Sequence, residues 1–152
     1  MKKHLQLSID FQLVDHLGQV VLSLLFRREA LRDWCLGLCL LKEGLVEALV
    51  VSEEHGKKGV KIQVRPNAKV SDRVLASFES DITRLELTPN NLGYLQHFFL
   101  KYYRDGVAEV DHLDLEAICS DAGHNEEIYI TFKVPDSMPP LTPEEAERRL
   151  KH

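Results

Sequence analysis

The sequence lacks the short motifs that identify several common enzyme classes. It contains no G-x-S-x-G nucleophile elbow, no G-x-G-x-x-G or G-x-x-x-x-G-K-[ST] phosphate loop, and no H-E-x-x-H zinc motif. The usual signatures of hydrolases, nucleotide-binding enzymes and metalloproteases are therefore missing. We expect no cofactor, and the sequence leans away from an enzyme.

Long hydrophobic runs are also missing. No stretch approaches the roughly 18 consecutive apolar residues of a membrane-spanning helix. The first residues, 1–4, lead directly into alternating polar and apolar residues, unlike the continuous apolar segment of a secretion signal. We therefore expect a cytoplasmic protein that does not bind membranes.

Cysteine is scarce, and its number is odd. Cys35, Cys39 and Cys119 occur in a chain without an export signal, which favours reduced thiols. Cys35 and Cys39 would share one face of a helix and could in principle join a metal site. However, no C-x-x-C pair and no second ligand pair at zinc spacing exists, and leucines surround both cysteines. We predict buried structural thiols and no metal.

Basic residues are fewer than acidic ones, 19 against 24, which gives a formal net charge of −5. Such a chain has no general attraction for nucleic acid phosphates, whereas a basic protein would be attracted to it. The length of 152 residues and the 44% of hydrophobic residues suit one domain with a real core. We expect another protein, basic in character, as the partner and no nucleic acid.

Patterns along the chain predict an α+β protein. Alternation or short apolar runs predict strands over 4–13, 20–26, 45–52, 59–65, 82–87, 108–118 and 126–134. Residues 28–41 fit helix and strand equally well, and we favour a short helix or turn entering a strand near 35–41. Residues 70–78 are either an irregular edge strand or a loop. Residues 1–135 form the predicted domain, followed over 136–152 by a proline-rich connection and a short charged helix.

One helix is predicted most clearly, over 89–104. Thr88 and Pro89 form its start, and Gly106 follows its end. Five of the chain's eleven Phe, Tyr and Trp residues lie on it. Its predicted buried face consists of Leu92, Leu95, Phe99 and Tyr102. We expect a largely antiparallel sheet of about six to seven strands packed against this one long aromatic-rich helix.

The sharpest polar cluster follows that helix. His112, Asp114 and Glu116 share one face of a predicted strand, with Asp111 just before them. An imidazole and carboxylates can hold a divalent cation or divide acid and base roles, and His124 could approach across the next loop. The simpler interpretation is a solvated or partner-facing strand, because same-face side chains lie roughly 6.5–7 Å apart and converge poorly on one metal. These four residues, 111, 112, 114 and 116, are our candidate binding residues.

Residues 82–116, with Leu87-Thr88-Pro89, the aromatic helix and the acidic strand, resemble a strand–helix–strand unit of small bacterial proteins. Some of those proteins are grouped with polymorphic-toxin immunity proteins. The resemblance implies a small acidic cytoplasmic α+β protein that works by binding, and it brings no catalytic motif.

Three functions therefore compete. The first is a non-enzymatic interaction module of the immunity type, which binds a basic partner through its acidic strand face. The second is a metal- or small-molecule-dependent enzyme centred on His112, Asp114 and Glu116. The third is a homodimeric structural subunit built through a sheet edge or an apolar helix. A concave pocket beside His112 would favour the enzyme, and a flat acidic surface would favour the interaction module.

Overall fold

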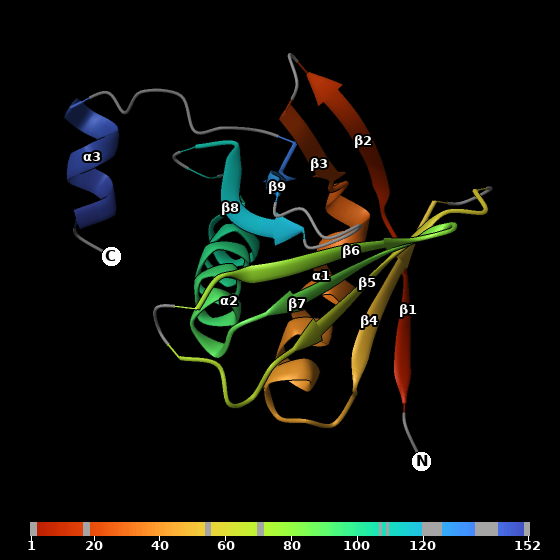
Figure 1. Ribbon diagram of the computed structural model, residues 1–152. Coiled ribbons are helices and arrows are strands. Elements are labelled where there is room, and N and C mark those ends of the chain that lie inside the picture. The colour runs from red at the N-terminus through yellow and green to blue at the C-terminus, as the bar shows by residue number, and fades with distance from the viewer. Residues whose placement is uncertain are drawn as a thin grey trace.

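A mixed β-sheet with two helices packed against it forms the body of the protein (Figure 1). The computed structural model describes residues 3–16, 19–53, 56–69, 72–106, 108, 110–119, 126–135 and 143–150. Its strands are β1 (His4–Ser8), β2 (Asp10–His16), β3 (Gln19–Leu25), β4 (Ala48–Ser52), β5 (Gly59–Val64), β6 (Val74–Glu79), β7 (Ile82–Leu87), β8 (His112–Cys119) and β9 (Glu126–Lys133). Its helices are α1 (Arg28–Lys42), α2 (Pro89–Asp105) and α3 (Pro143–Leu150). None of these described helices is long and apolar enough to cross a lipid bilayer.

The order of the strands across the sheet is β1-β4-β5-β7-β6-β8-β9-β3-β2. The predicted α+β class is confirmed, but the predicted largely antiparallel sheet of six to seven strands is wrong. The described sheet has nine strands, with four parallel and four antiparallel ladders. Each antiparallel ladder joins two consecutive strands, whereas each parallel ladder joins strands that are distant in sequence. Sequence periodicity detects the consecutive strands and carries no information about the parallel ladders.

One arrangement, a strand pair, a helix and a second strand pair, occurs twice along the chain. The first unit contains β2, β3, α1, β4 and β5, and the second contains β6, β7, α2, β8 and β9. Parallel ladders between β5 and β7 and between β9 and β3 join the two units. β1 and β2 are one strand interrupted at Ile9, with β1 beside β4 and β2 beside β3. In the second unit, β6 has the corresponding place, because it pairs with β8 on one side and with β7 on the other.

Helix α1 corrects the prediction of a short helix or turn entering a strand near 35–41, and it adds a second long helix to the one expected against the sheet. Its buried stripe includes Leu31, Trp34, Leu38 and Leu41. Gly37, although glycine has a low helix propensity, allows α1 to approach β4 closely. A Cβ atom at this position would lie only 3.0 Å from Leu49 Cδ2.

Helix α2 confirms the predicted helix together with its start and its end. Thr88 Oγ1 accepts a hydrogen bond from Asn91 N–H at 3.1 Å, and Asn91 Oδ1 accepts one from Thr88 N–H at 3.2 Å. These two bonds satisfy donors that every helix start leaves free. Gly106, with φ of 77°, ends the helix and donates its N–H to Tyr102 O at 2.7 Å. The predicted buried face, Leu92, Leu95, Phe99 and Tyr102, is buried.

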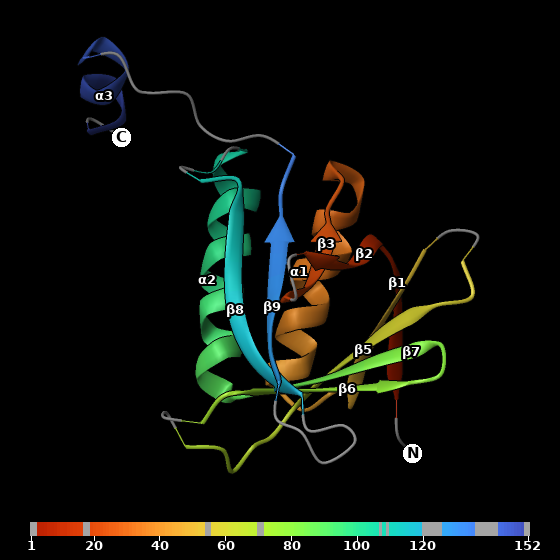
Figure 2. The same cartoon turned by 45° about the horizontal axis from the view of Figure 1, so that its top comes forward.

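The two helices lie side by side and run antiparallel, and β8 and β9 run lengthwise along them in Figure 2. The start of α1 therefore meets the end of α2, where Arg28 Nη1 donates to Gly106 O at 3.1 Å. The prediction for residues 70–78 is corrected, because β6 lies inside the sheet between β7 and β8. The predicted proline-rich connection lies largely outside the described residues, and the predicted C-terminal helix is present as α3.

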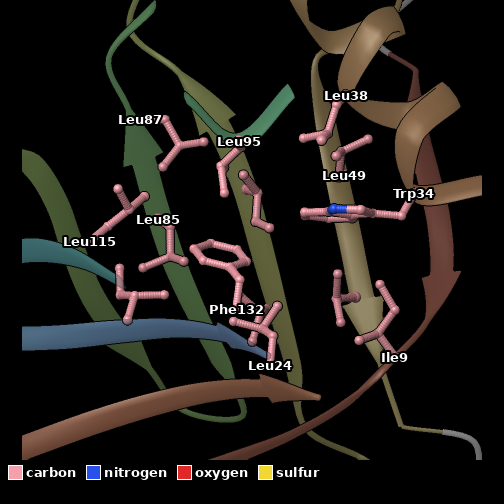
Figure 3. Packing of buried hydrophobic residues seen from close by; sticks show 14 of the residues in the cluster. Ile9, Leu24, Trp34, Leu38, Leu49, Leu85, Leu87, Leu95, Leu115 and Phe132 are labelled. Carbon is pink, nitrogen blue, oxygen red and sulfur yellow. The ribbon is translucent and has the colours of Figure 1, made fainter. Parts of the chain in front are cut away.

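Four aromatic rings lie at the centre of the core, and they belong to Phe26, Trp34, Phe99 and Phe132. The ring centre of Phe26 is 4.7 Å from that of Phe99 and 4.9 Å from that of Trp34. Both pairs are tilted, which is a favourable geometry for aromatic rings. Figure 3 shows Trp34 and Phe132 among buried leucines from the helices and the sheet. We call these four residues the aromatic cluster.

Phe99→Ala should lower the free energy of unfolding by about 3–5 kcal/mol, because it removes a fully buried ring from the aromatic cluster. Tyr94→Ala is the matched control on the same helix. Tyr94 is 59% exposed, and its truncation should cost less than about 0.5 kcal/mol. Urea unfolding followed by circular dichroism measures both values. Equally small losses for the two variants would contradict a central position of α2.

Candidate functional site

Strand β8 carries the predicted cluster on the sheet face that points away from the helices. It pairs with β9 along its whole length but with β6 only through residues 117–119. Leu115 points inward and is buried. His112, Asp114 and Glu116 occupy the alternate positions and are exposed, as the period of two predicts.

The imidazole of His112 lies between two carboxylates. Its Nδ1 is 2.7 Å from Asp111 Oδ1, and its Nε2 is 3.5 Å from Asp114 Oδ2. Asp111 is anchored just before β8, because its C=O accepts a hydrogen bond from Val134 N–H at 2.8 Å. A protonated imidazole donates from both ring nitrogens, so it bonds one carboxylate and faces the other. We call Asp111, His112 and Asp114 the histidine clamp.

Asp114 has a second partner on the neighbouring strand. Thr131 lies directly opposite it on β9, and Thr131 Oγ1 donates to Asp114 Oδ1 at 2.8 Å. Glu116 lies two residues further along the same face, opposite Tyr129. The structure thus brings three of the four predicted residues together and places Glu116 outside the clamp.

The clamp shifts two pKa values in opposite directions. The hydrogen bond to Asp111 raises the pKa of His112, and the charge of Asp114 adds to this effect. The same hydrogen bond lowers the pKa of Asp111. The side chains of the three residues are between 41% and 53% exposed, so water screens the ion pairs and they stabilise the fold little. The clamp can therefore hold charge and exchange a proton at the surface.

Three cavities of the described part of the chain lie away from the clamp, because none of them is lined by residues 111, 112, 114 or 116. No group of three His, Cys, Asp or Glu side chains in the described part of the chain is arranged to hold a metal ion. His124, which the sequence placed near this strand, lies outside the described residues.

The cysteines lie at the core and between the helices. Cys35 and Cys119 are buried, Cys39 is partly buried, and all three are free thiols. Burial raises the pKa of Cys35 to about 11, and the neighbouring Cys39 adds to the shift. A thiol with such a pKa stays protonated at neutral pH and is a poor nucleophile and metal ligand. Gln96 Nε2 on α2 donates to Cys39 Sγ at 3.7 Å.

The partners that fix the clamp were not found from the sequence. Thr131 occupies an outward position of a strand whose period of two was already clear, so its direction was predictable. Its place opposite Asp114 depends on the register between β8 and β9, which the sequence does not show. The bond from Val134 to Asp111 depends on the same register.

Comparison with family models, with curated proteins and with solved structures finds no match for this chain. The likeness to immunity-type proteins therefore stays a prediction from the sequence. Any functional conclusion must come from the geometry of the described residues.

Asp111→Asn should lower the pKa of His112 toward its ordinary value of about 6.5, because it removes the charged acceptor at Nδ1. Since the folded protein raises this pKa, the associated stability is fully present below about pH 6.5 and is lost as the pH rises through the folded value. NMR titration of the His112 ring protons measures the shift. Glu116→Gln is the control on the same face and should move it less. Identical titration of wild type and Asp111→Asn would show that the clamp does not form in solution.

Thiol reactivity should separate the three cysteines. Under denaturing, non-reducing conditions a thiol reagent should count all three. In the native protein Cys39 should react first, because Cys35 and Cys119 are buried. Cys39→Ser should remove this fast phase and leave two slow thiols. A stable bridge within the chain, seen as fewer than three thiols, would contradict the prediction.

Proposed function

We propose that the protein is a non-enzymatic interaction module that binds a basic protein partner through the outer face of β8. The contact residues are Asp111, His112, Asp114 and Glu116. The observation that carries this proposal is the exposure of Asp114 and Glu116 on one strand face, with Asp111 and Asp114 on the two sides of the exposed His112 imidazole. The immunity-type character rests on the sequence resemblance alone.

The surroundings of β8 support access by a macromolecule. Because β6 pairs only with residues 117–119, no described strand lies beside the edge of β8 next to His112, Asp114 and Glu116. The face and the edge are open together. Exposed charges of one sign steer an oppositely charged protein and set its orientation, and they do so without a pocket.

The histidine clamp makes the charge of this surface depend on pH. Protonated His112 offsets one of the carboxylate charges, whereas the neutral form leaves all of them uncompensated. Affinity for a basic partner should therefore rise as the pH increases through the raised pKa of His112. A purely steric interface would not respond in this way.

The enzyme alternative draws less support from the geometry. Catalytic groups work best in a concave site that excludes water. His112 lies on an open face, with carboxylates near both of its nitrogens. We therefore place the enzyme second.

Replacing Asp114 and Glu116 together by lysine should leave the fold intact and abolish capture of the basic partner. Both side chains are exposed, and surface substitutions usually change stability by less than about 0.5 kcal/mol. Affinity purification from a lysate of the source organism, with the wild type and the double variant as baits, identifies the captured proteins by mass spectrometry. With the purified partner, the loss of association rate should shrink as salt rises.

The matched control is Asp33→Lys with Glu43→Lys, which makes the same charge change at an exposed position of α1 and at the exposed residue that follows the helix. This control variant should still capture the partner. If both double variants lose the partner equally, the effect comes from net charge and not from the face of β8. Stoichiometric metal binding that disappears in His112→Ala, measured by calorimetry, would favour the enzyme instead.

A further inference from the structure

No described strand pairs with one of the two edges of strand β2. The strand pairs with β3 over its whole length, and no other described strand pairs with it (Figure 1). The N–H of Ile9, just before β2, points to the edge opposite β3, because it donates to Ser52 O on β4 at 3.1 Å. Alternate residues of a strand direct their main-chain groups to the same edge. Phe11, Leu13 and Asp15 therefore direct theirs to the open edge.

Apolar side chains are exposed along this edge. Leu13 is 50% exposed and Val14 is 45% exposed, and as neighbours in a strand they point to opposite faces. β2 contains no lysine, arginine, proline or glycine. In other sheets lysine and proline protect open edges, and glycine weakens a strand. Such an edge is a template for a further strand.

The open edge of β8 is more strongly protected than that of β2, where Asp15 is the one charged residue among Phe11, Leu13 and Asp15. Along β8, His112, Asp114 and Glu116 place a charged or polar side chain at every second position. Charges of this kind oppose pairing with another strand. Of these two open edges, that of β2 is therefore better suited to pairing than that of β8.

We propose that β2 pairs antiparallel with β2 of a second copy of this chain, about a twofold axis at Leu13. Leu13 then lies opposite the partner's Leu13, and Phe11 lies opposite the partner's Asp15. These are the residues whose main-chain groups reach the open edge, so every one of those groups finds a partner. The two sheets become continuous, with the helices of both copies on the same side.

The composition of β2 favours a second copy over another protein. The register about Leu13 pairs all seven residues of the strand, whereas a register centred on Gln12 or Val14 leaves part of the edge open. Neither aspartate of β2 meets the other. The strand is therefore complementary to itself, as a twofold interface requires.

Sedimentation velocity over a range of concentrations tests this dimer. The wild type should sediment as a dimer. Leu13→Lys should raise the dimer dissociation constant at least about tenfold, because it sets two like charges directly opposite each other. Leu36→Lys is the matched control, since Leu36 is 53% exposed on α1 and away from β2, and it should leave the dimer unchanged.

A cross-link tests the register independently of Leu13→Lys and of its folding. Gln12 lies opposite the partner's Val14 as a non-hydrogen-bonded pair, with Cα atoms about 4.5 Å apart, which suits a disulfide. Gln12→Cys with Val14→Cys should therefore give a covalent dimer under mild oxidation that reductant reverses. A wild type that stays monomeric, a dimer insensitive to Leu13→Lys, or absence of the cross-link would each overturn the proposal.

Discussion

The rest of the structure depends on the aromatic cluster between the two units of the chain. Phe26 and Trp34 belong to the first unit, and Phe99 and Phe132 belong to the second. Neither unit encloses this centre by itself, because each contributes two of its four rings. The parallel ladders β5 to β7 and β9 to β3 then hold the same two units together through the sheet. Burial of the rings and formation of the ladders are therefore one event, and we expect the units to fold together.

This constraint divides the two faces of the sheet between stability and recognition. The inward positions of β8 and β9 are committed to the core, as Leu115 and Phe132 show. The outward positions carry the histidine clamp and Thr131, whose exposed polar contacts contribute little to folding. Substitutions on the outer face can therefore change recognition with little effect on the stability of the core. That separation is what a recognition surface on a small domain needs.

Local signals in the sequence predicted local structure well, and long-range pairing accounts for the failures. The capped start of α2 at Thr88 and the period of two around His112 each depend on neighbouring residues, so both were readable. α1 was ambiguous because Trp34 and Leu38 suit a helix and a strand alike, and the close contact of Gly37 with Leu49 is a tertiary fact. The mixed sheet was not predicted because its parallel ladders also depend on contacts between residues far apart in the sequence. The binding role of Asp111 and of the three β8 residues His112, Asp114 and Glu116 stays a prediction.

The acidic residues of β8 admit two physical roles, and the sign of the charge separates them. Protection of an open edge requires only charge, so lysine would serve as well as aspartate or glutamate. Attraction of a basic partner requires negative charge, and lysine would reverse it. The histidine clamp adds a third consideration, because two carboxylates held beside one imidazole give a charge that changes with pH, which edge protection does not need. A binding surface would therefore require both the negative charge and the histidine clamp. Residues that only protect the edge could carry positive charge instead and could lose the clamp.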